Sequence, residues 1–399
     1  METLTIAASV HDFNPVRTAM QRYVDQDILA GASYAILRGQ DILDMQCVGW
    51  ADKESNTHLR TDHIFRAMSN TKLITSMAVM LLWEEGRIHL DEPIGKFIAQ
   101  LADLKVLKPG ASRLDETEPA RSPITIRHLL THSSGLSYGL LDPGSLLFNA
   151  YNERRVINPH KPLISMMDAL SDLPLMFQPG ASWEYSVATD VLGYLVEVVS
   201  GQDLEQFFKS RIFDVLGMED TAFTLPPEKH SRLATCYAGA DGMDPMKPGL
   251  RPVDTVPWRG AYLQPFPLKM GGGGLATTLP DMVALVRSLV PGGKSVLKPE
   301  TITAMMTNQL PEGRNIQFAR FGEIRGKGYG LGGAVTLKPS AIDPRASTGE
   351  FQWGGLAGTH WWISPQTGLV GVLMAQRQMG FWNPFSFEFK QLAYRAAGH

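Results

Sequence analysis

Strand-like patterns occupy both ends of this 399-residue chain, and helical spacing fills its middle. Helical spacing that begins at Val16 leads into two apolar runs separated by an Arg-Gly-Gln turn at Arg38 to Gln40. Near the other end, strand-like runs separated by Gly and Ser-Pro turn signals are followed by a helical pattern: Glu350 to Trp353, Gly358 to Ile363, Leu369 to Ala375 and then Phe385 to Ala397. We therefore expect both termini to contribute to one antiparallel sheet with flanking helices.

The middle of the chain predicts a second, mainly helical lobe. Its helical segments are separated by Pro and Gly: Leu73 to Glu85, Ile126 to Thr131, Leu163 to Leu170, Asp190 to Val199 and Leu204 to Val215. The stretch 226–267 is rich in Pro, Gly and Asp, which predicts an irregular crossover or a loop lining a cleft. Chains of this length usually form more than one core. We expect an α/β fold of the α+β type, with a discontinuous sheet lobe (1–68 and 275–399), a helical lobe (69–274) and a site between them.

Composition argues against several kinds of partner. A formal net charge of −3 and the absence of a long Lys/Arg run provide no basic surface for nucleic acid. No stretch approaches the roughly 20 apolar residues of a membrane span, and the first residues do not form a secretory signal, so we expect a cytoplasmic protein. Cys47 and Cys236 lack metal-ligand spacing, and no cofactor or metal is implied. The oligomeric state stays open.

Ser69 and Lys72 stand directly before an apolar segment of helical length, Leu73 to Leu82. The segment has few charges and predicts a buried helix. Residues three apart share one face of a helix, which places the Lys72 ammonium one turn above the Ser69 hydroxyl. A serine becomes nucleophilic when a neighbouring base removes its proton, and a lysine partly stripped of water can be that base. The helix start adds free backbone N–H groups and a positive dipole end.

A second Ser-x-x-Lys, Ser295 to Lys298, shows that the spacing alone is weak evidence, because about one such pattern is expected by chance in this chain. It lies between Pro291-Gly292-Gly293 and Pro299, which indicates a surface turn. His132 and His360 are the candidates for a Ser-His-Asp triad, but the chain has no Gly-x-Ser-x-Gly elbow.

Two further motifs are ambiguous when taken singly. Tyr185 follows a Pro-Gly turn and precedes an apolar helical segment, a position typical of a packing residue. In Trp353-Gly354-Gly355 the glycines interrupt a strand pattern, which is typical of a tight edge turn or of close approach by a ligand or another backbone.

Taken in order, the motifs resemble those of the class C β-lactamase-like serine hydrolases, and the chain is most similar to the family VIII carboxylesterases among them. The motifs are Ser-x-x-Lys at 69–72, Leu-Leu-Thr-His-x-Ser-Gly-Leu at 129–136, Pro-Gly-x-x-Trp-x-Tyr-Ser at 179–186 and Trp-Gly-Gly at 353–355. The resemblance runs from about Gly31 to the C-terminal helix. It implies a β-lactamase/penicillin-binding-protein-like fold.

The resemblance also implies roles for particular residues. Ser69 would be the acylated nucleophile, and Lys72 and Tyr185 would share the network that deprotonates it and later activates water. Trp353-Gly354-Gly355 occupies the strand position of the Lys-Thr-Gly of β-lactamases. The backbone N–H groups of Ser69 and Leu356 would form the oxyanion hole. His132 would be a structural residue at a turn.

Two departures from the β-lactamase pattern indicate a neutral substrate. Val187 stands two residues after Tyr185, where β-lactamases typically have Asn, and Trp353 replaces the Lys that meets a β-lactam carboxylate. A neutral ester against Tyr138, Trp353-Gly354-Gly355 and one of Trp361 and Trp362 fits this pocket better.

The leading hypothesis is therefore a carboxylesterase acting on small, for instance short-chain, esters, with acyl transfer or weak β-lactamase activity as side reactions. One alternative has the same chemistry on a β-lactam or a D-amino-acid peptide. A second alternative is an inactive binding protein of the same fold.

Overall fold

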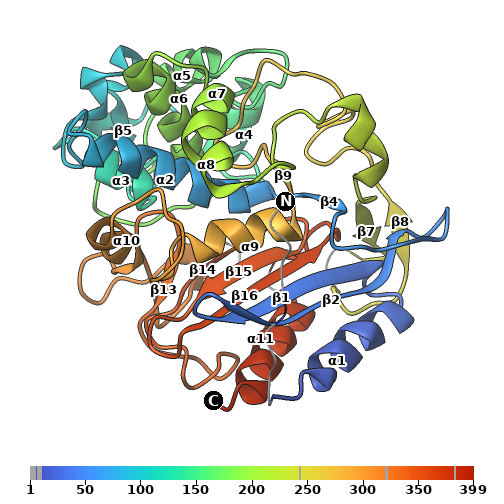
Figure 1. Ribbon diagram of the computed structural model, residues 1–399. Coiled ribbons are helices and arrows are strands. Elements are labelled where there is room, and N and C mark those ends of the chain that lie inside the picture. Colours follow the sequence, from blue (N-terminus) through green and yellow to red (C-terminus); the bar gives the residue numbers. More distant parts are fainter. Residues whose placement is uncertain (1–5, 7–10, 242–243, 320–321, 382) are drawn as a thin grey trace.

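The computed structural model describes residue 6 and residues 11–241, 244–319, 322–381 and 383–399. Most of the N-terminal segment on which the expected absence of a secretory signal rests lies outside these residues. The core of the fold is an antiparallel sheet with the strand order β12-β13-β14-β15-β16-β1-β2-β3 (Figure 1). Its strands are β12 (Lys327–Tyr329), β13 (Ala334–Thr336), β14 (Phe351–Gly355), β15 (Thr359–Ile363), β16 (Leu369–Ala375), β1 (Gly31–Arg38), β2 (Asp41–Asp52) and β3 (Thr57–His58).

Both termini build this sheet, as the sequence predicts. β1 pairs with β2 across the turn at Gly39, which has a φ of +58°, and on its other side it pairs with β16, where Ala32 lies opposite Ala375. Glycine adopts that backbone conformation without a steric penalty. The edge strand β12 and its neighbour β13 were not expected, because segments of three residues are too short to show an alternating pattern.

The central strand β1 is buried on both faces, and its side chains alternate between two hydrophobic cores. Ala35 and Leu37 belong to the core shared with the helical part of the molecule, whereas Tyr34 and Ile36 belong to the core beneath the terminal helices. Helices α1 (Asn14–Asp25) and α11 (Pro384–Ala396) cover that second face, and α9 (Leu279–Arg287) lies on the opposite side of the sheet (Figure 1).

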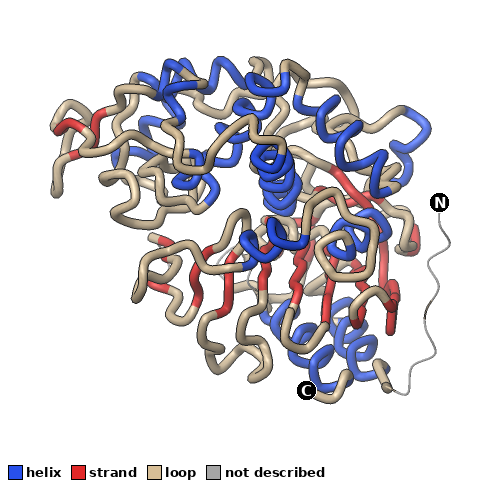
Figure 2. Tube along the Cα trace, turned by 60° about the vertical axis from the view of Figure 1, so that its left-hand side comes forward, coloured by secondary structure: helices blue, strands red, loops and turns tan. Residues whose placement is uncertain are grey.

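The remaining helices gather mainly beyond α9, on the side of the sheet away from α1 and α11 (Figure 2). They are α2 (Thr71–Glu84), α3 (Ile126–Leu130), α4 (Leu146–Glu153), α5 (Leu163–Ser171), α6 (Ala188–Ser200), α7 (Leu204–Phe208), α8 (Asp214–Leu216) and α10 (Pro299–Met306). Every residue of α2 from Thr71 to Leu82 is buried, which confirms the prediction of a buried helix. Within the described ranges, no helix has the length and apolar character needed to cross a membrane.

The stretch 226–267 is less irregular than predicted. Its described part, which leaves out 242–243, contains a 3₁₀ helix, η5 (Pro227–Arg232), and a two-stranded pair, β7 (Tyr237–Gly239) with β8 (Leu250–Pro252). These strands are three residues long, so the Pro and Gly around them hide any periodicity. Three further small pairs are β4 (Ile64–Arg66) with β9 (Ala276–Thr278), β5 (Lys105–Leu107) with β6 (Thr117–Pro119) and β10 (Gln317–Phe318) with β11 (Gly322–Glu323).

Candidate active site

Ser69 lies in a short 3₁₀ turn, η1 (Met68–Asn70), that runs directly into α2. Met68 has a φ of +48°, a left-handed conformation that costs an L-residue about 1 kcal/mol and persists only where the surroundings enforce it. The surroundings do so here, because the Ala67 N–H donates to the Leu275 carbonyl (2.9 Å) and the Thr359 hydroxyl donates to the Ala67 carbonyl (3.0 Å). The turn therefore holds Ser69 at the start of a helix with its side chain partly exposed.

The structure brings the three predicted catalytic residues together. The Tyr185 hydroxyl donates to Ser69 Oγ at 2.6 Å, and Lys72 Nζ donates to the same oxygen at 3.5 Å. Lys72 Nζ also donates to the Gly272 carbonyl at 2.6 Å and lies 4.6 Å from the centre of the Tyr185 ring. The Lys72 side chain is fully buried, so these contacts replace its hydration. Ser69 Oγ is therefore within hydrogen-bond reach of both the Tyr185 hydroxyl and Lys72 Nζ.

His132 supports the Tyr185 loop and does not contact Ser69. Its Nδ1 accepts the Ser186 N–H at 3.3 Å, and its carbonyl accepts the Glu184 N–H at 2.9 Å. Burial and the nearby Lys72 charge hold the pKa of His132 well below its usual value, so the ring is neutral. His360, the other histidine considered for a triad, hydrogen-bonds through Nε2 to the Gly380 carbonyl at 3.2 Å. Neither of these two histidines is therefore placed to act as a base for Ser69.

The Trp353-Gly354-Gly355 strand β14 passes directly beside the Ser69 turn. A Cβ atom on Gly355 would lie 2.5 Å from the Ala67 carbonyl oxygen and 2.3 Å from Thr359 Oγ1. Only glycine permits this approach, which brings the backbone that leads into Leu356 next to the segment that leads into Ser69. Leu356 itself is partly exposed in the turn between β14 and β15.

Aromatic rings pack around the ring of Tyr185. The Tyr138 ring stacks on that of Tyr185 with centroids 5.9 Å apart, and the Trp353 ring lies 5.4 Å from it. The structure therefore places both predicted substrate-binding aromatics at the site. Trp362 belongs on the other face of the sheet, because its ring packs 5.3 Å from that of Phe389 in α11. Consecutive strand residues face opposite sides, so Trp362 cannot line the site.

Two residues near Lys72, Asp190 and Gly272, were not predicted from the sequence. Gly272 contacts Lys72, and Asp190 contacts Gly272. Asp190 lies in the first turn of α6 and is fully buried, and its Oδ1 accepts the Gly272 N–H at 2.9 Å. The only sequence signals were an acidic residue inside an apolar segment and the run Gly271 to Gly274, and neither indicated a contact with the other.

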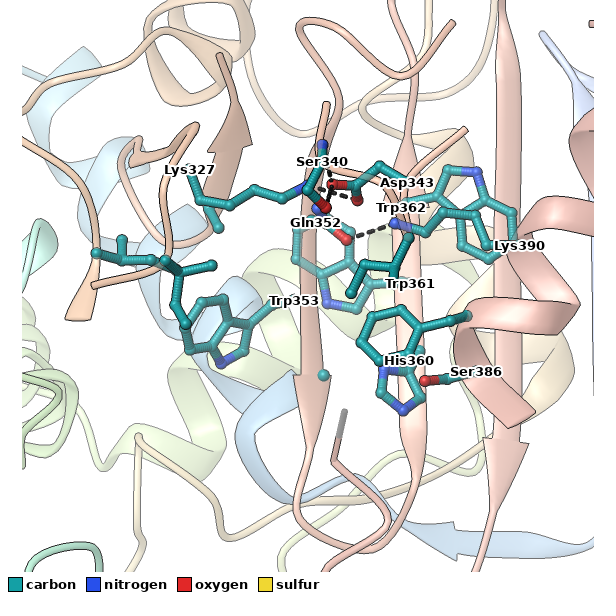
Figure 3. A pocket seen from close by; sticks show the side chains of 16 residues that line it. Lys327, Ser340, Asp343, Gln352, Trp353, His360, Trp361, Trp362, Ser386 and Lys390 are labelled. Carbon is teal, nitrogen blue, oxygen red and sulfur yellow. Dashed lines mark hydrogen bonds and ion pairs between the residues drawn. The ribbon is translucent and has the colours of Figure 1, made fainter. Parts of the chain in front are cut away.

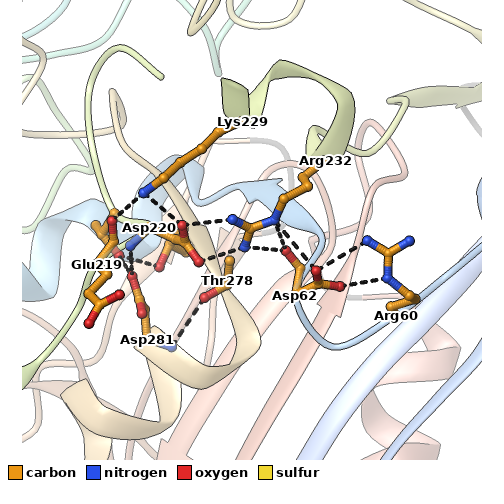
Figure 4. Close-up of polar contacts among 10 residues, drawn as sticks. Arg60, Asp62, Glu219, Asp220, Lys229, Arg232, Thr278 and Asp281 are labelled. Atoms are coloured by element: carbon orange, nitrogen blue, oxygen red, sulfur yellow. Dashed lines mark hydrogen bonds and ion pairs between the residues drawn. The ribbon is translucent and has the colours of Figure 1, made fainter. Parts of the chain in front are cut away.

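A polar network anchors the strand that leads to Ser69 (Figure 4). Arg232 donates to the Asp62 carbonyl, at 2.6 and 2.8 Å, and to both oxygens of Asp220. Asp281, at the start of α9, accepts the Asp220 N–H at 2.9 Å, while its own N–H donates to Thr278 Oγ1. The network therefore links three parts of the chain that are distant in sequence: the residues before β4, the segment around Asp220 and Arg232, and the start of α9 after β9.

A pocket of about 150 Å³ lies along β14 (Figure 3). Its two lysines are already paired: Lys327 with Asp343 at 2.7 Å, and Lys390 with Glu350 and with Gln352, each at 2.5 Å. The lining is otherwise largely apolar, and it includes Trp353 and Gly354. The pocket presents no lysine free to bind an anion.

Ser295, in the second Ser-x-x-Lys pattern, has surroundings unlike those of Ser69. It is exposed, and its hydroxyl donates to the Leu297 carbonyl at 2.9 Å inside a turn, as the flanking Pro and Gly residues predict. Within the described residues, no group of three or more His, Cys, Asp or Glu side chains is arranged to hold a metal ion.

Comparison with known proteins identifies the family. The Beta-lactamase family model matches residues 16–383. Esterase EstB of Burkholderia gladioli is 30% identical over 92% of this chain and 91% of its own, and a lovastatin esterase of Penicillium rubens is 32% identical over 78% and 79%. The solved structure of EstCE1, described as a hydrolase with promiscuous acyltransferase activity, superposes with a TM-score of 0.81 at 24% identity and covers 96% of this chain and 98% of its own. The sheet flanked by helices, the Ser69 turn at the start of a buried helix and these matches agree, and the chain belongs to the beta-lactamase family.

Proposed function

We propose that this protein is a serine hydrolase of the family VIII carboxylesterase type that cleaves small carboxylic esters through an acyl-enzyme on Ser69. The observation that carries the proposal is the position of Ser69 Oγ, 2.6 Å from the Tyr185 hydroxyl and 3.5 Å from Lys72 Nζ, at the start of a buried helix. A nucleophile within hydrogen-bond reach of a base that is itself held in place is the arrangement expected for acyl transfer. The names of EstB and lovastatin esterase support ester cleavage.

In the proposed reaction, Ser69 Oγ attacks the ester carbonyl while its proton passes to the Lys72–Tyr185 couple. The couple returns that proton to the departing alcohol. In the second half of the reaction it takes a proton from the attacking water and gives one back to Ser69 Oγ, as the bond between Oγ and the acyl carbon breaks and the acid leaves. The backbone N–H groups of Ser69 and Leu356 stabilise the oxyanion, each by about 3 kcal/mol. The protons of Lys72 and Tyr185 are shared, so the base is the couple and neither residue alone.

A neutral acyl group suits the surroundings of Ser69. Tyr138 and Trp353 lie against the Tyr185 ring, so the site presents aromatic faces where a β-lactamase would present a lysine. Aromatic faces bury apolar groups well. Small esters with a neutral acyl group are therefore the proposed substrates, with Trp353, Gly354, Gly355 and Tyr138 in contact with them.

Intact-mass spectrometry tests this proposal. Brief mixing with p-nitrophenyl butyrate should add one butyryl group to the wild-type protein and none to Ser69→Ala, while nitrocefin should give little adduct. An adduct from nitrocefin alone would replace the ester proposal by the amide alternative. Failure of a serine-directed phosphonate to label the folded protein would favour the inactive binding protein.

We also propose where the two lobes meet and where the protein is located. The lobe boundaries are at 68/69 and 274/275, and the protein is cytoplasmic. Limited proteolysis that releases 69–274 as an intact fragment, and fractionation of the producing cells, would test them.

A further inference from the structure

Asp190 is linked to the proposed base through one residue, Gly272. The N–H of Gly272 donates to Asp190 Oδ1 at 2.9 Å, and the carbonyl of Gly272 accepts from Lys72 Nζ at 2.6 Å. The other carboxyl oxygen, Oδ2, has no hydrogen-bond partner within the described part of the chain, although Asp190 is fully buried. A buried carboxylate with a free oxygen is costly unless a nearby charge compensates it.

The glycines at 271–273 determine how closely Asp190 can approach this loop. A Cβ on Gly272 would lie 2.6 Å from Asp190 Oδ2, and one on Gly271 would lie 2.9 Å from the Thr189 carbonyl. By contrast, a Cβ on Gly273 would meet nothing closer than 3.8 Å. The first two glycines are therefore required for the carboxylate to reach this loop.

The charges around Asp190 are few. Burial raises the pKa of Asp190, and the Lys72 ammonium from α2 acts in the opposite direction. The phenol of Tyr138, from the segment after α3, has its pKa raised well above the usual value by burial and, in part, by the Asp190 charge. Of these two titratable groups from other elements, only Lys72 can carry a positive charge.

We propose that Asp190 is a positioning residue of the active site: its carboxylate is the counter-ion of the Lys72 ammonium, and its hydrogen bond holds the Gly272 carbonyl on that ammonium. The inference rests on the proposed function, in which Lys72 and Tyr185 form the base. A negative charge at Asp190 makes it harder for the couple to lose its first proton, whichever of the two residues releases it. Asp190 thereby sets the lower pH limit of catalysis.

The test is Asp190→Asn, which keeps the volume and the Oδ1 acceptor for Gly272 but removes the charge. The acid limb of kcat/KM against pH, measured with p-nitrophenyl butyrate, should move to lower pH by about one unit, at the low end of the effect of a nearby opposite charge. A residue that only supports the fold would lower kcat/KM without moving the limb. The matched control is Asp281→Asn, which neutralises another buried carboxyl at the start of α9 and should leave the limb in place.

A second readout does not depend on turnover or on the stability of the variant. In wild-type protein with ¹⁵N-labelled lysine and ¹³C-labelled aspartate carboxyl groups, the Asp190 carboxyl carbon should report the titration of Lys72 Nζ at the same midpoint. Lys72→Met assigns the lysine signal and should remove that step from the Asp190 curve.

The outcomes separate the two proposals. A shared midpoint together with absence of ester turnover keeps the role of Asp190 and refutes the esterase. Ester turnover with an acid limb unmoved in Asp190→Asn, or with no Lys72 step in the Asp190 curve, refutes the role of Asp190 and keeps the esterase.

Discussion

Replacing Gly355 by alanine should separate strand β14 from the Ser69 turn. The new Cβ would lie 2.5 Å from the Ala67 carbonyl oxygen, and an ordinary contact begins near 3.4 Å, so one side must move by about 1 Å. Both neighbours are structural: Ala67 is held by the Leu275 carbonyl, and Thr359 is hydrogen-bonded to Ala67. If the movement withdraws one oxyanion donor, the loss is about 3 kcal/mol, or a factor of about 10² in kcat.

Steady-state kinetics with p-nitrophenyl butyrate, together with thermal unfolding, would measure this effect. We expect kcat to fall about 100-fold, KM to change little, and the unfolding free energy to drop by about 1–3 kcal/mol from overpacking. Gly273→Ala is the control, because its Cβ has room, and it should retain wild-type kcat. A Gly355→Ala enzyme with kcat within about threefold of wild type would refute the claim that this approach positions the oxyanion hole.

Three further changes test other parts of the structure. Tyr185→Phe removes the hydroxyl 2.6 Å from Ser69 Oγ and should lower kcat/KM for p-nitrophenyl butyrate by about 10²–10⁴, so near-wild-type kinetics would exclude Tyr185 from the base. Burial raises the pKa of Glu184 from 4.5 to about 7, so the folded state is stabilised below that range and loses this contribution as the pH rises through 7. Glu184→Gln should therefore gain about 1–3 kcal/mol over wild type between pH 5 and pH 8 in urea unfolding, and a pH-independent difference would contradict this. Gly371→Ala would place a Cβ 2.0 Å from the Trp362 ring and should lower the melting temperature, while the kcat of the folded enzyme stays unchanged, since Trp362 faces α11.

The sequence predicted the parts of the site that local pattern encodes. Ser69 and Lys72 are three residues apart at the start of an apolar segment, so helix geometry alone places them on one face. Tyr185 could be added only through the order of motifs, because 116 residues separate it from Ser69 and no local rule measures that distance. The antiparallel sheet was predictable for the same reason as the helix, since β1, β15 and β16 are long enough to show their apolar pattern.

The features that were missed depend on contacts between distant segments. Asp190 reads as one polar residue in an apolar helix, and its bond to Gly272 spans 82 positions. Strand β13 forms because it pairs with β14, and the edge strand β12 forms because it pairs with β13, while their own residues have no strong pattern. The exclusion of Trp362 from the site required its packing against Phe389 in α11, which the residues of β15 alone do not show.

The pairing of β1 with β16 has a consequence for how the protein is made. The two strands are neighbours in the sheet, yet the ribosome synthesises β16 roughly 330 residues after β1. Until then β1 has one open edge, and β14, which flanks Ser69, is itself made only shortly before β16. A nascent chain therefore acquires its nucleophile early and its activity last, and it must avoid aggregation through an unpaired strand edge in the meantime. Synthesis should accordingly depend on chaperones more than the unfolding free energy of the finished protein would suggest.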